Sequence, residues 1–291
     1  MKSINLMIIG AQKAGTTSLK SYLSQHPMLI THQQPEMIFF LDDETYSLGY
    51  EHAYHRYFPN YETGKMLLAK NVGVMYSHQA VERLYKHNPQ MHLVILLRDP
   101  VDRAYSAYWF ARRRGQEDLM TFEEAIEASP DRFQGDFRKG NCSYLDRSLY
   151  TKHLEVVFSL FPRSQVLIFL TDDMKKDIRG VCTQIFSSVG LDQDILLDTK
   201  REHNRASIAR SELLARMLGR KSFIKKAVRK ILSDRPADGI KKMINRLNEQ
   251  EISIPPISSE TAQRLAKYFR PHNEKLAKLI GRDLSHWNKH V

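Results

Sequence analysis

Short apolar segments, several of them apolar throughout, alternate along this 291-residue chain with longer segments that have the apolar spacing of helices. The expected strands are Leu6–Ile9, Met66–Ala69, His92–Leu97 and Gln165–Leu170. The expected helices are Thr17–Gln25, Ser77–Lys86, Val101–Arg114, Ser148–Leu160, Ile178–Val189 and Ser259–Ile280, the last with an interruption near Pro271. A strand that is apolar on both faces must be covered on both faces, which is typical of parallel sheets. The alternation therefore predicts an α/β fold, a parallel β-sheet flanked by helices.

The length and the cysteine content limit the class of protein. A chain of this length buries enough surface to fold without covalent staples, as one large α/β domain or as two smaller domains. Its two cysteines, Cys142 and Cys182, have no metal-type spacing, so we expect neither a disulfide scaffold nor a metal site. We find no signal peptide and no apolar run near the ~20 residues of a spanning helix, so we expect a cytoplasmic protein.

The positive charge is concentrated in one segment. Residues 210–246 contain twelve basic and three acidic side chains and so carry nine of the eleven net positive charges. Because the rest of the chain is close to neutral, the charge does not indicate a nucleic-acid partner. The segment has helical apolar spacing, and we interpret it as a basic helical segment packed on the domain. Peripheral contact with a membrane surface is the open alternative.

The first apolar segment runs directly into a loop of small residues, Gly10–Thr17. A strand, a small-residue loop and a helix start bind phosphate through backbone N–H groups and the helix dipole. Gly10 and Gly15 have the spacing of the ATP-binding loop, but Thr16 stands where that loop has its lysine. The cation is instead Lys13, inside the loop, which places it beside a bound 5′-phosphate and the group that this phosphate carries.

A second motif follows the third expected strand. Arg98 stands at the carboxyl end of that strand, where α/β sheets bind ligands, and Ser106 falls two turns into the next helix. The guanidinium and the hydroxyl are suited to bind one further phosphate. The alternative is that Arg98 pairs with Asp102 and Ser106 is only a small packing residue.

Together the two motifs, Lys13–Thr17 and Arg98–Tyr108, resemble those of the sulfotransferases that use 3′-phosphoadenosine 5′-phosphosulfate (PAPS). Pro35–Phe40 and the C-terminal Tyr268–Trp287 are most similar to the heparan sulfate-type branch and its bacterial relatives. The resemblance covers nearly the whole chain. It implies a single domain over residues 1–291 with a P-loop-like sulfotransferase fold, and the release of 3′-phosphoadenosine 5′-phosphate (PAP). We expect no requirement for a metal, because Lys, Arg and backbone N–H groups can meet the charge of the leaving group.

The resemblance also implies which residues bind the donor. The first loop holds the 5′-phosphosulfate, the second motif holds the 3′-phosphate, and a late loop closes over the nucleotide. The expected binding residues are Gln12, Lys13, Ala14, Gly15, Thr16, Thr17, Ser18, Arg98, Ser106 and Arg205. Lys13 is also expected to act in catalysis, because it can neutralise the charge that builds up on the departing phosphate.

Two further residues are expected to act in catalysis by the same resemblance. Glu36 occupies the place of the carboxylate base of the heparan-type branch, although Ile38 stands where that branch often has a histidine. Lys70 matches a lysine near the sulfuryl group or the acceptor. The cytosolic branch has a catalytic histidine two residues after its lysine, and this chain has Val72 there, which favours Glu36 as the base.

The sequence leaves the acceptor and the oligomeric state open. We expect sulfuryl transfer to a hydroxyl, with an amine as the alternative, on a small natural product or a saccharide. A glycolipid and an acidic polysaccharide are the other acceptors. The competing activity is that of a P-loop-type nucleotide kinase or NTPase, but this chain lacks the lysine of that loop, and we find no clear strand-terminal Asp to hold magnesium.

Overall fold

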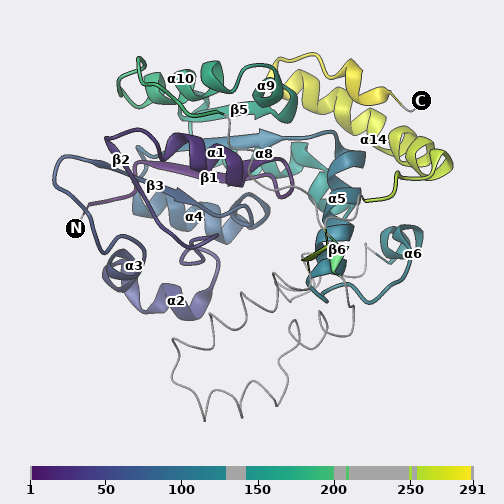
Figure 1. Ribbon diagram of the computed structural model, residues 1–291, viewed down its shortest axis with the longest axis horizontal. Coiled ribbons are helices and arrows are strands. Elements are labelled where there is room, and N and C mark those ends of the chain that lie inside the picture. The colour runs from purple at the N-terminus through teal and green to yellow at the C-terminus, as the bar shows by residue number, and fades with distance from the viewer. Residues whose placement is uncertain (1, 129–141, 200–207, 210–248, 251–253, 290–291) are drawn as a thin grey trace, which may run out of the picture. The chain divides into compact units, whose positions relative to one another are not determined.

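The computed structural model describes residues 2–128, 142–199, 208–209, 249–250 and 254–289 (Figure 1). It consists of two compact units that are interleaved along the chain. The first unit is Met1–Asp99, Tyr150–Asn204 and His272–Leu284, and the second is Pro100–Leu149, Arg205–Pro271 and Ser285–Val291. Arg205 and the basic segment 210–246 lie outside the described residues, and the single domain over 1–291 stays a prediction.

A five-stranded sheet forms the centre of the first unit. Its strands are β1 (Leu6–Gly10), β2 (Leu29–Thr31), β3 (Met66–Lys70), β4 (His92–Leu97) and β5 (Val166–Leu170), in the order β2-β3-β1-β4-β5. All neighbouring strands are parallel, which confirms the expected sheet. Only β2 of this sheet was not expected, because a strand of three residues is too short to show a pattern.

The helices of the first unit are α1 (Thr16–Leu23), α2 (Asp43–Ser47), α3 (Gly49–Tyr57), α4 (His78–His87), α8 (Tyr150–Leu160), α9 (Thr171–Lys176) and α10 (Ile178–Ser188). Short 3-10 turns lie at η1 (Val74–Tyr76) and η4 (Arg163–Gln165). Each expected helix is present, with ends that differ by at most two residues. The helices α2, α3 and α9 are additional to the expected ones.

The direction of the crossovers places helices on both faces of the sheet. α1 connects β1 to β2 on one side of β1, whereas α4 and α8 lead towards β4 and β5 on the other side. Because crossovers between parallel strands are right-handed, α1 lies on the opposite face from α4 and α8. The contacts agree, since α1 packs with α10 and α4 packs with α8 (Figure 1). Both faces of β1 are thus covered, and all five of its residues are buried.

The second unit packs helices around an aromatic core. Its helices are α5 (Pro100–Arg113), α6 (Phe122–Glu127) and the first half of α14 (Ser259–Ile280), and its short turns are η3 (Asp146–Ser148) and η5 (Ser285–Asn288). A two-stranded sheet of β6 (Ile208–Ala209) and β7 (Glu249–Gln250) also belongs to this unit. Tyr108, Phe122, Tyr144 and Phe269 are buried together in this unit. The helix α14 runs through Pro271 without a break, so the interruption that the sequence suggested there is wrong.

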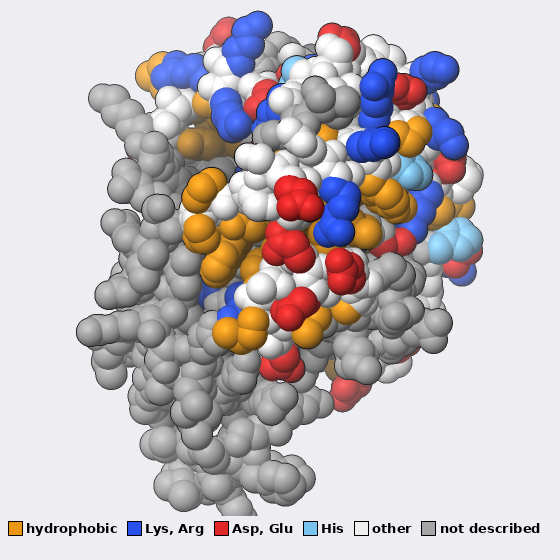
Figure 2. All heavy atoms as spheres, turned by 90° about the vertical axis from the view of Figure 1, so that its right-hand side faces the viewer, with side chains coloured by type: hydrophobic (Ala, Val, Ile, Leu, Met, Phe, Trp, Pro, Cys, Tyr) orange, Lys and Arg blue, Asp and Glu red, His pale blue; other side chains and the backbone are white. Residues whose placement is uncertain are grey.

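Acidic side chains form a group on the face of the molecule drawn in Figure 2. In the second unit, α6 carries three acidic residues, Glu123, Glu124 and Glu127. Glu127 lies 3.5 Å from Arg264 of α14, and the hydroxyl of Thr261 donates a 2.5 Å hydrogen bond to Glu123. These contacts tie α6 to α14 within the unit. In the described residues no helix is long and apolar enough to cross a membrane.

We predict that Gly10→Ala destabilises the first unit. A Cβ at Gly10, the last residue of β1, would overlap the sulfur of Met75. The expected loss is about 1–3 kcal/mol in the free energy of unfolding, the usual range for overpacking a core. Urea titration measures this loss, and it should be smaller in a Met75→Ala background because the two residues share one space. An equal loss in both backgrounds contradicts the explanation.

Candidate functional site

The loop between β1 and α1 has the geometry of an anion site. Lys13 and Gly15 both have positive φ angles, 71° and 100°, which turn the chain sharply before the helix. Gly15 caps α1 without a side-chain hydrogen bond, and no acidic residue lies in the first turn of the helix. The positive end of the helix dipole therefore remains unneutralised by side chains of that turn, which favours a bound phosphate.

Neighbouring segments of the first unit hold this loop in place. The backbone N–H of Gln12 donates to the hydroxyl of Tyr76 over 3.2 Å. The hydroxyl of Thr171, at the start of α9, donates to the carbonyl of Ala14 over 2.9 Å. The loop is thus fixed from the η1 turn after β3 and from the end of β5.

Arg98 brings the second motif to the same loop. It follows the last residue of β4, and its guanidinium donates to the carbonyl of Lys13 over 3.3 Å. Its own carbonyl accepts a 2.8 Å hydrogen bond from the hydroxyl of Tyr150. The structure therefore brings Arg98 to Lys13. Ser106 lies on α5 in the second unit, so its convergence with Arg98 stays a prediction.

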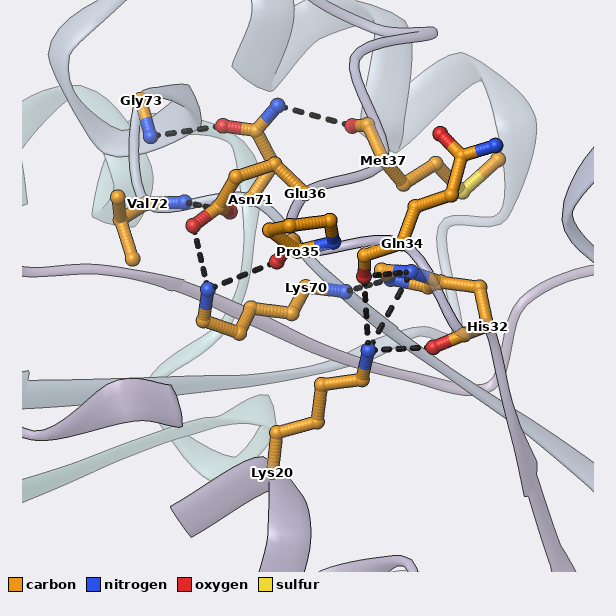
Figure 3. Close-up of polar contacts among 10 residues, drawn as sticks. All are labelled: Lys20, His32, Gln34, Pro35, Glu36, Met37, Lys70, Asn71, Val72 and Gly73. Atoms are coloured by element: carbon orange, nitrogen blue, oxygen red, sulfur yellow. Dashed lines mark hydrogen bonds and ion pairs between the residues drawn. The ribbon is translucent and has the colours of Figure 1, made fainter. Parts of the chain in front are cut away.

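Glu36 and Lys70 form an ion pair at the end of β3 (Figure 3). The ammonium of Lys70 is almost fully buried and also donates to the carbonyl of Pro35 over 3.0 Å. The second carboxylate oxygen of Glu36 accepts the backbone N–H of Val72 over 3.1 Å. The carboxylate thus has a fixed orientation, while 32% of the Glu36 side chain stays exposed and accessible to a ligand.

The register of the sheet places this pair beside the anion loop. Ile8 of β1 pairs with Lys70 of β3, and the N–H of Asn71 donates to the carbonyl of Ile8 over 2.9 Å. β1 ends two residues later at Gly10, where the loop begins. Both features therefore lie at the carboxyl edge of the sheet, the usual ligand-binding edge of α/β folds.

A network of hydrogen bonds supports the segment before Glu36 (Figure 3). The sequence motifs did not indicate it. Lys20, on α1, donates to the carbonyls of His32 and Gln34 over 2.5 and 3.1 Å. The ring of His32 lies 3.1 Å from the backbone N–H of Lys70 and 2.8 Å from the carbonyl of Gln34. In sequence, Lys20 and His32 are ordinary polar residues of a helix and a loop, so no motif could have indicated this role.

Burial and neighbouring charge shift the titration of two groups in this network. Burial lowers the pKa of His32 to about 3, with a further lowering by the charge of Lys20. Burial also lowers the pKa of Lys20 to about 8, and the charge of Lys70 adds to that effect. His32 is therefore neutral near pH 7, whereas Lys20 keeps most of its charge.

Among the described residues, no group of three or more His, Cys, Asp and Glu side chains could hold a metal ion. Two histidines lie near η1. His78, the first residue of α4, is mostly exposed and lies 3.8 Å from Glu82, and the buried ring of His153 lies 5.0 Å from the ring of Tyr76. The arrangement that the structure does supply is an anion loop with a lysine beside a fixed, partly exposed carboxylate. Such a pair of features suits transfer of an anionic group to an acceptor that loses a proton.

Comparisons with known proteins identify the family. The model of the sulfotransferase domain matches residues 3–229. The human bifunctional heparan sulfate N-deacetylase/N-sulfotransferase 3 is 26% identical, with 97% of this chain and 30% of that protein covered. The mouse heparan sulfate glucosamine 3-O-sulfotransferase 5 is 31% identical, with 55% of this chain and 45% of that protein covered. The chain thus spans less than half the length of these curated relatives.

A solved structure shows the same fold. The crystal structure of a sulfotransferase from Alicyclobacillus acidocaldarius matches with a TM-score of 0.72 and 24% identity, over 99% of both chains. The P-loop-like sulfotransferase fold expected from the two motifs is therefore confirmed.

We predict that His32 makes the folded state sensitive to acid. As the pH falls from 6.5 towards 3, an unfolded histidine takes up a proton while the buried ring does not, so the unfolded state gains stability. The free energy of unfolding should fall by up to about 1.4 kcal/mol per pH unit from this group. Urea titrations across that range should show the fall in the wild type and a shallower one in His32→Gln. Equal slopes contradict the prediction.

Proposed function

The chain belongs to the sulfotransferase domain family, enzymes that use PAPS, and from this premise we propose that it transfers the sulfuryl group of PAPS to an acceptor and releases PAP. The observation that carries the proposal is the position of the Lys13 loop beside the Glu36–Lys70 pair at one edge of the sheet. The Lys13 loop suits the anionic donor, and the Glu36–Lys70 pair suits the acceptor, which must lose a proton.

For the donor, we propose that the backbone of residues 12–18 surrounds the 5′-phosphosulfate. PAPS supplies the activated sulfuryl group when bound. Lys13 then offsets the negative charge on the phosphate oxygen that keeps the electron pair of the broken S–O bond. We also propose that Arg98, whose guanidinium donates to the Lys13 carbonyl, binds the 3′-phosphate of the same nucleotide together with Ser106. Arg205 is proposed to make a further phosphate contact.

For the acceptor, we propose that Glu36 is the general base. The acceptor hydroxyl or amine forms the new bond to sulfur and gives its proton to the carboxylate. Lys70 and the N–H of Val72 hold that carboxylate in one orientation, so little reorganisation is needed when the proton moves. The exposed part of Glu36 is where the acceptor must arrive.

The relatives suggest which acceptors to test first. One is named as an N-sulfotransferase of heparan sulfate and another as a glucosamine 3-O-sulfotransferase, so we propose a saccharide that offers an amine or a hydroxyl. Small natural products and glycolipids form the second group. Incubating the protein and PAPS with both groups, followed by mass spectrometry of the products, tests the proposal. PAP release without sulfation of any acceptor in the panel argues against these classes of acceptor.

A cytoplasmic location and a membrane contact by residues 210–246 also stay proposals.

We predict that Arg98→Ala weakens PAP binding by about 1.5–3 kcal/mol, the range for a hydrogen bond to a charged group. The loss should be smaller for 5′-AMP, because that nucleotide lacks the 3′-phosphate. Calorimetry with both nucleotides, with and without Mg²⁺, measures the difference. Equal, unchanged affinities would mean that Arg98 does not bind the 3′-phosphate. Binding that needs Mg²⁺ would instead favour a kinase or NTPase.

We predict that Lys13→Ala lowers turnover by about 100-fold or more, the scale for removing one charge-stabilising donor. Lys175→Ala is the matched control, because Lys175 is an exposed lysine of α9 that pairs with Asp172. Initial rates of PAP formation with an acceptor from the panel provide the measurement. Normal turnover in Lys13→Ala rules out its role with the leaving group.

We predict that Glu36→Gln keeps PAP binding but lowers turnover about 10²–10⁴-fold, the range for removing a general base. The acidic limb of the kcat/KM–pH profile should disappear, because that limb reports the free base. Glu82→Gln on α4 is the matched control. A near-normal rate with the same acidic limb would place the base elsewhere, and His78 would be examined next.

A further inference from the structure

His32 takes the place of a strand partner for Lys70. β2 ends at Thr31, whose partner on β3 is Leu68, so the sheet does not continue as far as Lys70 on that side. The N–H of the next residue, Asn71, points to β1, and successive N–H groups of a strand point to opposite sides. The N–H of Lys70 therefore faces the missing strand, and the His32 ring accepts it through Nε2 at 3.1 Å.

The contacts also fix the state of the His32 ring. Nε2 must be unprotonated, since it accepts the N–H of Lys70. Nδ1 lies 2.8 Å from the carbonyl of Gln34 and 3.3 Å from the ammonium of Lys20. Because a neutral ring with an unprotonated Nε2 carries its hydrogen on Nδ1, Nδ1 donates to the Gln34 carbonyl. Only the neutral ring with the hydrogen on Nδ1 satisfies both contacts. A protonated ring would lose the Lys70 contact and leave a buried N–H without an acceptor.

Lys20 fixes the same segment from the other side. Its ammonium donates to the carbonyls of His32 and Gln34 and so closes the turn that leads to Pro35 and Glu36. Lys70 donates to the carbonyl of Pro35 from β3. Residues 32–36 are therefore held by two ammonium groups, that of Lys20 on α1 and that of Lys70 on β3 (Figure 3).

We propose that Lys20 and His32 are positioning residues for the Glu36 carboxylate. Neither side chain has a contact with Glu36 among the hydrogen bonds described above. Each instead holds the backbone that carries Glu36, so that the two carboxylate oxygens of Glu36 reach the Lys70 ammonium and the Val72 N–H. The inference deepens the proposed function, since it rests on Glu36 as the base of sulfuryl transfer. It adds two residues that neither sequence motif contains.

The test uses the Val72 amide as a reporter of the Glu36 position, because that amide donates to the carboxylate. In Lys20→Met, hydrogen exchange at Val72 should become about tenfold faster, the effect of losing roughly one net hydrogen bond. The Ile95 amide of β4 and the affinity for PAP should not change. Lys86→Met, at an exposed position of α4, is the matched control. If Lys20→Met does not fold, hydrogen exchange at Val72 is measured in Lys20→Gln, which keeps a hydrogen-bond donor.

The two histidine variants separate positioning from packing. In His32→Gln the amide oxygen can replace Nε2, so the Lys70 amide should stay slow to exchange, whereas His32→Phe keeps the ring shape and should expose that amide. Both the Lys70 and Val72 amides should exchange faster in His32→Phe. Unchanged exchange at Val72 in Lys20→Met and His32→Phe overturns the proposal.

Kinetics distinguish this failure from that of the proposed function. With an acceptor from the panel, Lys20→Met should lower kcat about tenfold at an unchanged KM for PAPS, because the carboxylate is misplaced but the donor site is intact. If Glu36→Gln lowers turnover but Lys20→Met does not, the positioning role is wrong and the base assignment stands. If Glu36→Gln keeps full turnover, the base assignment fails, and the exchange rate at Val72 still decides whether Lys20 orients Glu36.

Discussion

The parallel pairing of β1 with β3 is the constraint on which the candidate site depends. Because Ile8 lies opposite Lys70, the end of β3 reaches the same edge of the sheet as the loop that begins at Gly10. A shift of one residue would turn the Lys70 side chain to the other face, away from Glu36. The buried apolar residues of both strands fix the register, so the packing of the core determines where the polar chemistry lies.

The site contains charges that are unusual for a protein interior. Burying the ammonium of Lys70 costs several kcal/mol unless it is paired and hydrogen-bonded. Glu36 and the Pro35 carbonyl supply both, and Lys20 is satisfied in the same way by two carbonyls. His32 adds no further positive charge to this network, because burial keeps its ring neutral. The members of the network thus support one another, so the removal of one member should affect the others.

Much of the fold could be predicted from the sequence, because its signals are local. The apolar segments identified four strands of the parallel sheet, and Gly10, Lys13 and Gly15 identified the anion loop. Family motifs also identified Glu36 and Lys70, which the structure pairs. β2 was missed because three residues show no period, and Pro271 was taken as a helix break although α14 runs through it.

By itself, the sequence determined the fold class and the types of residue available for the chemistry, since apolar periodicity and motif spacing are properties of neighbouring residues. Only the tertiary structure decided that Arg98 reaches the Lys13 carbonyl and that Lys20 and His32 hold the segment before Glu36. These contacts join residues of α1, the segment after β2, and the ends of β3 and β4. The physical reason is that such contacts depend on strand order, register and crossover direction, which no local pattern contains.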